Sequence, residues 1–167
     1  PLSPYGASKA AAELFIRTAT SLSGLRHTIL RSANVYGPRQ DPFGEAGVVA
    51  IFTRAMLDGG APTIFGDGSQ QRDYVYVDDG VHANLLAAEI DGDGVFNIGT
   101  GNGTMVSEVF AELAEVSGYG GTPTYAPERS GDIGQIFLDV GRAQRELGWR
   151  PETSFKDGAA RTVDSMR

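Results

Sequence analysis

A tyrosine and a lysine four residues apart, Tyr5 and Lys9, are residue types that could carry out proton transfer at this spacing. If Ser3 caps a helix and Pro4 is its first residue, the two side chains lie about one turn apart on the same face. An ammonium group beside a phenol favours the phenolate, so Tyr5 could accept and return a hydroxyl proton. A surface tyrosine and lysine at a helix start would have the same spacing.

Arginine supplies nearly all the positive charge, because lysine occurs only at positions 9 and 156. The planar guanidinium group is suited to bidentate contacts with phosphate. Arg72 lies at the start of a predicted strand, where it could bind phosphate oxygens or form a surface ion pair with Asp73 or Asp67.

The composition limits the classes of function. The chain has 167 residues, 41% of them hydrophobic, which is enough for one domain with a substantial core. It has no cysteine and two histidines, so thiolate metal sites are excluded and we expect no metal. The net charge of −7 argues against general nucleic-acid binding. No apolar run approaches the roughly 20 residues that span a bilayer, so we expect no membrane segment.

Alternating helices and strands must position these side chains, and this pattern predicts an α/β protein. Apolar periodicity predicts helices over residues 5–22, 48–57, 79–90, 106–117, 141–147 and 155–165. Short apolar runs predict strands over residues 28–31, 63–65, 74–77, 95–98, 124–125 and 135–137. The second and third of these strands, joined through a turn at residues 66–68, are predicted to form a hairpin-like unit. Residues 34–45 are predicted to be a loop, and Asp78 or Asp79 to cap the helix that follows.

A glycine-rich turn at residues 99–104 follows a strand and precedes a helix, as in dinucleotide-binding folds. The third glycine position of that fingerprint holds Thr104, where a small residue is needed for the helix to pack on the strand. No strand ending in Asp or Glu follows about 20 residues later to hold a ribose. We therefore expect a tight turn with Thr104 as a helix cap.

Six segments carry a recognisable pattern in a fixed order. They are residues 4–9 (PYGASK), 30–39 (LRSANVYGPR), 64–68 (IFGDG), 71–79 (QRDYVYVDD), 96–101 (FNIGTG) and 147–151 (LGWRP). Together they resemble the NAD-dependent nucleotide-sugar epimerase/dehydratase branch of the extended short-chain dehydrogenase/reductase family. The likeness is greatest to enzymes of the UDP-glucose 4-epimerase type.

The resemblance implies the C-terminal part of a Rossmann-like NAD-binding fold together with the small α/β substrate-binding domain. The N-terminal half, with its glycine-rich loop, is expected to lie outside this chain. Residues 1–33 and 70–99 would be the remnant of the Rossmann sheet with the catalytic helix. Residues 34–69 and 100–167 would form the part that binds the nucleotide sugar. A cytoplasmic enzyme that forms a homodimer through the Tyr5 helix is also implied.

The resemblance gives each candidate residue a role. Tyr5 would be the catalytic acid/base and would also contact NAD, and Lys9 would activate Tyr5 and bind the nicotinamide ribose. Ser32 would lie beside the cofactor, at a position where related enzymes often have tyrosine.

The remaining matched residues would bind the nucleotide sugar. Asn34 would contact the pyrophosphate, although an Asx turn is the alternative. Arg72 and Arg129 would bind phosphate and Asp132 the ribose, although the segment around the last two is also typical of a solvated loop. The backbone of the predicted strand Thr63, Ile64 and Phe65 would contact the uracil, and Val48 is a further candidate contact.

The resemblance implies epimerisation of a nucleotide sugar at C4 through a 4-keto intermediate, with NAD as a tightly bound cofactor. UDP-glucose, UDP-galactose or a UDP-N-acetylhexosamine is the expected substrate. A 4,6-dehydratase or decarboxylase of the same family is the alternative. A hypothesis of another class is an inactive fragment with at most weak nucleotide-sugar binding, and we expect the 167-residue chain alone not to retain NAD.

Overall fold

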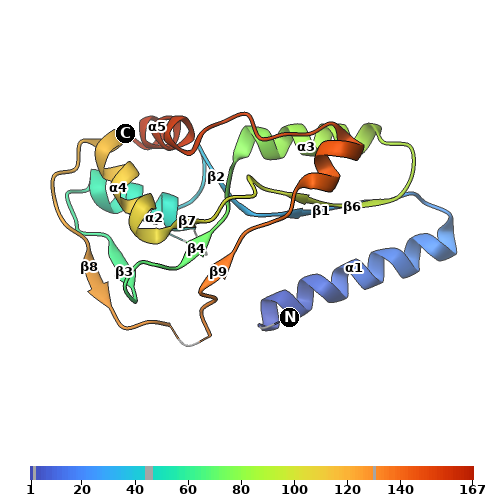
Figure 1. Cartoon of the computed structure of the whole chain (residues 1–167), viewed down its shortest axis with the longest axis horizontal. Helices are drawn as coiled ribbons and strands as arrows, with labels where there is room; N and C mark the ends of the chain where they lie inside the picture. Colours follow the sequence, from blue (N-terminus) through green and yellow to red (C-terminus); the bar gives the residue numbers. More distant parts are fainter. Residues whose placement is uncertain (2, 44–46, 130) are drawn as a thin grey trace.

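The computed structural model describes residues 1, 3–43, 47–129 and 131–167. It is an elongated α/β structure, as predicted (Figure 1). At one end, β1 (Thr28–Ser32) pairs in parallel with β6 (Gly94–Ile98). Helix α1 (Pro4–Ser23) lies on one face of this pair and α3 (Val77–Glu89) on the other (Figure 1).

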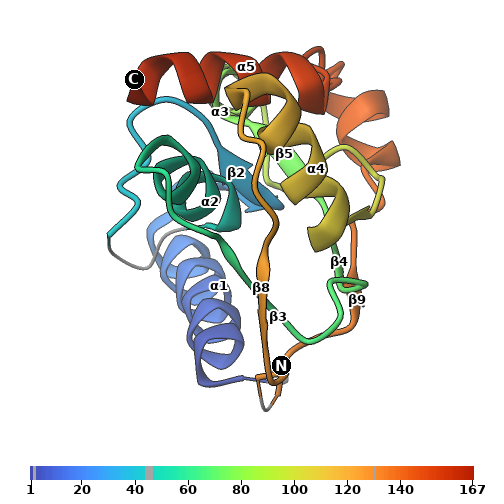
Figure 2. The same cartoon turned by 90° about the vertical axis from the view of Figure 1, so that its left-hand side faces the viewer.

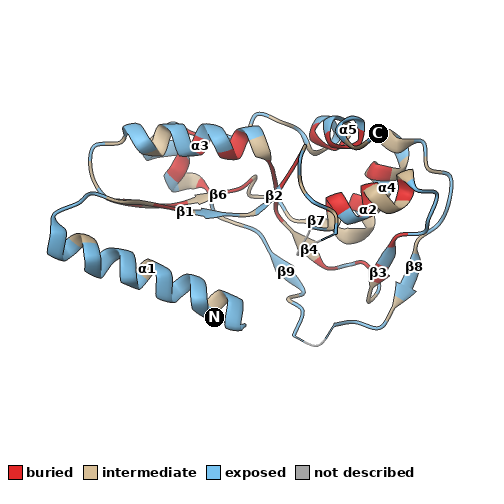
Figure 3. Ribbon diagram, turned by 180° about the vertical axis from the view of Figure 1, so that it is seen from behind, coloured by how far each residue is buried: buried red, intermediate tan, exposed pale blue. Residues whose placement is uncertain are grey.

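Helix α1 begins and ends where the sequence predicts. The Ser3 hydroxyl accepts a hydrogen bond from the Gly6 amide at 3.0 Å, Pro4 is the first helical residue, and Gly24 closes the helix with a φ of 72°. No residue of α1 is buried, and Figure 3 shows the helix exposed along most of its length. A bidentate ion pair joins it to β1: the Arg31 guanidinium donates to the Glu13 carboxylate at 2.7 and 2.6 Å.

At the other end, three helices pack together around an apolar core. These are α2 (Val48–Leu57), α4 (Val106–Ser117) and α5 (Phe155–Met166), and the first two occupy the predicted residues. They lie against a parallel pair formed by β2 (Asn34–Tyr36) and β5 (Tyr74–Tyr76). A second parallel pair, β3 (Thr63–Phe65) with β8 (Thr124–Ala126), passes beside α2 and α4 (Figure 2).

A small three-stranded sheet lies between the two ends. Its central strand is β4 (Gln71–Arg72), flanked by β7 (Thr104–Met105) and β9 (Gln135–Ile136). After β9, a single π-helical turn, η1 (Ala143–Leu147), leads to Trp149. The Trp149 side chain is fully buried, and its indole N–H donates to the Asp79 carbonyl at 2.9 Å.

Four local predictions are wrong. Strands β3 and β5 form no hairpin, because each pairs in parallel with a different strand, β8 and β2. Residues 34–36 are the strand β2 rather than loop, and residues 44–46 lie outside the described residues. Thr104 is in β7 and Met105 caps α4. Tyr76 occupies the N-cap of α3, and the Asp79 carboxylate instead accepts hydrogen bonds from the Glu152 and Thr153 amides.

The glycine-rich turn after β6 closes around a buried carboxylate. Asp73 is 3% exposed and accepts hydrogen bonds from the Thr100 amide and hydroxyl at 2.8 and 2.7 Å. It also accepts from the Gly101 amide at 3.0 Å and the Leu138 amide at 3.3 Å. A Cβ atom at Gly99 would collide with this carboxylate. The turn therefore binds a side chain of the protein itself.

Candidate active site

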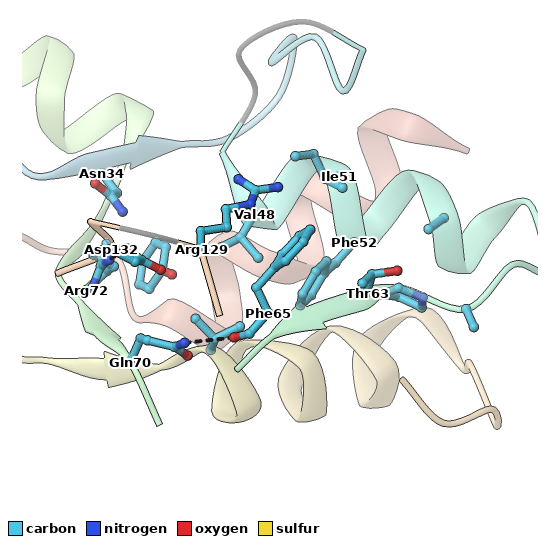
Figure 4. Close-up of a pocket in the computed structure, with 15 residues that line it drawn as sticks. Asn34, Val48, Ile51, Phe52, Thr63, Phe65, Gln70, Arg72, Arg129 and Asp132 are labelled. Carbon is cyan, nitrogen blue, oxygen red and sulfur yellow. Dashed lines mark hydrogen bonds and ion pairs between the residues drawn. The ribbon is translucent and has the colours of Figure 1, made fainter. Parts of the chain in front are cut away.

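A cavity of about 410 Å³ lies where β3, β4 and α2 meet, a size typical of small-molecule sites (Figure 4). Seven of the eight predicted substrate contacts line it: Asn34, Val48, Thr63, Phe65, Arg72, Arg129 and Asp132. They come from five separate stretches of the chain. The eighth, Ile64, is 1% exposed, and its side chain packs in the core.

The polar end of this cavity holds two oppositely charged side chains in contact. The Arg72 guanidinium donates to the Asp132 carboxylate at 2.5 Å and to the Gln71 carbonyl at 2.8 Å. The side chains of Arg72 and Asp132 are 18% and 29% exposed, so the pair lies in the wall of the cavity. Neither of the predicted alternative partners, Asp73 and Asp67, pairs with Arg72 in the described part of the chain.

The apolar end is formed by β3 and α2. Strand alternation directs Thr63 and Phe65 to the cavity and Ile64 to the core. The Arg129 guanidinium carbon lies 3.8 Å from the centre of the Phe65 ring, a close cation–π contact. The cavity therefore offers a flat apolar wall beside two guanidinium groups, which suits a planar ring attached to an anion.

A second cavity, of about 780 Å³, lies between α1 and the end of β1. Tyr5, Lys9 and Ser32, the three predicted cofactor contacts, all line it. The Lys9 ammonium lies 5.2 Å from the centre of the Tyr5 ring, so both side chains share one face of α1 as predicted. The Tyr5 residue is 69% exposed, which leaves its hydroxyl open to a ligand.

Among the residues that line the first cavity without having been predicted, two carry buried polar groups. Tyr74 is 5% exposed, and burial raises the pKa of its hydroxyl to about 12. Gln70 is 7% exposed, and its side-chain amide donates to the Phe65 carbonyl at 2.7 Å. Tyr74 sits in a strand whose neighbours are also apolar or aromatic, so its sequence context gave no sign of a cavity. A buried glutamine after a glycine turn likewise has no distinctive local pattern.

Among the described residues, no three His, Cys, Asp or Glu side chains are grouped so as to hold a metal ion. Within the same residues, no helix has the length and apolar character needed to cross a membrane.

Comparison with known proteins reveals close similarity along the whole chain. It is 46% identical to a putative UDP-glucose 4-epimerase of Methanocaldococcus jannaschii over 167 residues, and 46% identical to the UDP-glucose 4-epimerase of Mycolicibacterium smegmatis over 168. Both alignments cover 100% of this chain and 54% of the relative, so the chain spans about half the length of these relatives.

A crystal structure of UDP-glucose 4-epimerase from Thermotoga maritima with UDP-glucose superimposes with a TM-score of 0.96 at 53% identity. The superposition covers 99% of this chain and 53% of the other, and it confirms the Rossmann-like epimerase fold. The sequence profile described as the NAD dependent epimerase/dehydratase family matches residues 1–99. The chain therefore belongs to the NAD dependent epimerase/dehydratase family.

Proposed function

We propose that this chain contributes the nucleotide-sugar site and the proton-transfer residues of an NAD-dependent C4 epimerase that acts on UDP-sugars. The cavity lined by Phe65, Arg72, Arg129 and Asp132 is the observation that supports this most strongly. It combines an apolar wall with cationic side chains and a carboxylate, which are the groups that recognise a base, phosphates and a ribose. The similarity to UDP-glucose 4-epimerases favours uridine as the nucleoside.

The cavity beside α1 fits the nicotinamide end of NAD. It presents a phenol and an ammonium group side by side, next to the small side chains of Ser32 and Ala33 at the end of β1. The turn at residues 99–103 does not fit the cofactor phosphates, because its amides donate to Asp73. When bound, NAD supplies a reversible hydride acceptor.

Tyr5 takes the proton of the sugar 4-hydroxyl and returns it at the end of the reaction. Lys9, one turn along the helix, favours the phenolate form of Tyr5 and binds the cofactor ribose. Arg72 and Arg129 bind the pyrophosphate, which fixes the distance between the sugar and Tyr5. Ser32 lines the cavity beside α1, two residues before Asn34, which lines the nucleotide cavity.

The type of reaction and the formation of a homodimer are also proposals. A dehydratase or decarboxylase reaction would use the same nucleotide site and the same Tyr5, so the reaction assay distinguishes these alternatives. A homodimer would cover α1, whose Leu14, Phe15 and Leu22 side chains are 68%, 75% and 85% exposed.

Calorimetric titration with UDP tests the binding site. We expect binding that Arg72→Ala weakens by about 10- to 100-fold, because hydrogen bonds to charged groups contribute about 1.5–3 kcal/mol. C4 epimerisation of UDP-glucose, followed by NMR in a protein that includes this chain and binds NAD, tests the reaction. Tyr5→Phe should lower kcat by about 100-fold or more with UDP affinity retained. Near wild-type turnover in Tyr5→Phe would exclude the acid/base role.

A further inference from the structure

A single buried side chain closes the turn that joins the proposed base-binding strand to the proposed phosphate-binding arginine. Strand β3 ends at Phe65 and β4 begins at Gln71, and the turn between them contains two glycines with φ of 72° and 82°. Gln70 stands at the end of this turn. Its side-chain Nε2 reaches back and donates to the Phe65 carbonyl at 2.7 Å (Figure 4).

The surrounding residues make room for this hydrogen bond and fix it. A Cβ atom at Gly66 would lie 2.6 Å from the Gln70 Nε2, so a larger residue there would displace the amide. The main chain of Gln70 is held as well, because its carbonyl accepts from the Val106 amide at 3.0 Å. The position of the Phe65 carbonyl relative to α4 and β4 is therefore set through Gln70.

Gln70 uses only one end of its side-chain amide for hydrogen bonding within the described structure. Its Oε1 is buried and has no hydrogen-bond donor among the residues that the structure describes. An unsatisfied buried oxygen costs free energy, and the hydrogen bond to the Phe65 carbonyl offsets part of that cost, since a hydrophobic side chain would leave this carbonyl without its donor. The donating end of Gln70 holds the backbone carbonyl of Phe65, a residue that lines the cavity.

We propose that Gln70 is a positioning residue for the nucleotide, which sets the placement of the β3 edge relative to Arg72. The inference rests on the proposed function, in which the base lies against β3 and the phosphates bind Arg72. Because Gln70 acts through the Phe65 carbonyl, its loss should weaken ligands that engage both places at once. A ligand that engages only the arginines should bind as before.

Two ligands and a matched control separate this role from a general loss of structure. Gln70→Met removes the donor and keeps the length of the side chain without adding charge. Gln135→Met removes a side-chain amide donor at an exposed position outside the cavity, where the Gln135 amide donates to the Gln71 side-chain oxygen. Calorimetry would measure the dissociation constants for UDP and for inorganic pyrophosphate.

We expect Gln70→Met to weaken UDP binding by about tenfold, which corresponds to the loss of about one well-placed hydrogen bond at the base. Pyrophosphate binding should change by less than about twofold, and Gln135→Met should bind both ligands like the wild type. A Gln70→Met variant that binds UDP like the wild type would overturn the inference. An equal loss for both ligands would assign Gln70 a purely structural role and would also overturn it.

Gln70→Glu provides a second test, in which the UDP affinity of the variant is compared with that of the wild type at several pH values. Burial against a carbonyl raises the pKa of a carboxyl group, and only the protonated group can donate to Phe65. The UDP affinity of this variant relative to wild type should therefore recover as the pH is lowered from about 8 to about 5.5. The charged groups on the elements around this position include Asp67 of the turn, Glu108 in the first turn of α4, and Arg72, Glu128, Arg129 and Asp132. They are the same in both proteins, so their titration affects both affinities and largely cancels in the ratio.

A relative affinity that does not rise at low pH would contradict the role of the donor. If the wild-type chain does not bind UDP, the proposed function fails before Gln70 is tested. If it binds UDP and the Gln70 variants behave as the wild type, only the positioning role fails.

Discussion

Replacing Asp73 by asparagine should destabilise the protein strongly, although the two side chains have nearly the same shape. One carboxylate oxygen accepts both hydrogen bonds from Thr100, and the other accepts from the Gly101 and Leu138 amides. An asparagine keeps one oxygen and places an NH₂ group against the donors of the other. At least two hydrogen bonds to a charged acceptor are then lost, at about 1.5–3 kcal/mol each. Relief of the buried charge offsets part of this, so we expect a loss of about 3 kcal/mol.

Urea unfolding followed by circular dichroism would measure this loss. With an m-value of about 2 kcal/mol/M for a chain of this size, the midpoint should fall by about 1.5 M. Asp67→Asn is the matched control, because Asp67 is exposed and its carboxylate bonds only with neighbouring Ser69 in the described structure. We expect its stability to change by less than about 0.5 kcal/mol. A midpoint for Asp73→Asn within about 0.3 M of the wild type would refute the reasoning, since the four donors would then have other acceptors.

Two further predictions concern helix packing. Gly158→Ala should lower the free energy of unfolding by about 1–2 kcal/mol, as measured by urea unfolding. The new methyl group of α5 would collide with the Tyr36 hydroxyl, and this overpacking outweighs the gain in helix propensity. A variant more stable than the wild type would contradict this. Glu13→Gln should release α1 from β1 and increase hydrogen exchange in α1 and not in α5. The hydrogen bond from Arg31 lowers the pKa of Glu13 in the folded protein, so the ion pair stabilises docking above the unfolded pKa of about 4.3 and is lost as the pH falls through the lower folded value. Equal exchange in α1 at neutral pH in wild type and Glu13→Gln would contradict this role.

The sequence predicted those elements that are determined by local interactions. Ser3, Pro4 and Gly24 mark the ends of α1 because their effects depend on the nearest backbone groups. Strand pairing was not predictable in the same way. Residues 66–68 carry a turn signal, yet β3 pairs with a strand about 60 residues further along the chain. Ile64 of β3 is buried in one core with side chains of α2 and α4, and no local pattern reports such contacts between distant segments.

The same distinction applies to the candidate site. Arg72, Arg129 and Asp132 were found because they stand in segments that resemble a known family, and their roles stay predictions. Gln70 and Asp73 were missed because their importance lies in what they contact. Asp73 accepts from residues 27 to 65 positions away, and the partner of Gln70 is a backbone carbonyl. The identity of such partners becomes visible only in three dimensions.

The burial of Trp149 gives this protein an internal optical probe. It is the only tryptophan in the chain, and its indole ring is enclosed between α3 and η1. Its emission should therefore lie toward shorter wavelengths in the folded state and shift to longer wavelengths when this core opens. Trp149 does not line the cavity of about 410 Å³ that we propose for the nucleotide. Fluorescence should thus record the opening of one core while remaining insensitive to a ligand bound at the other end of the molecule.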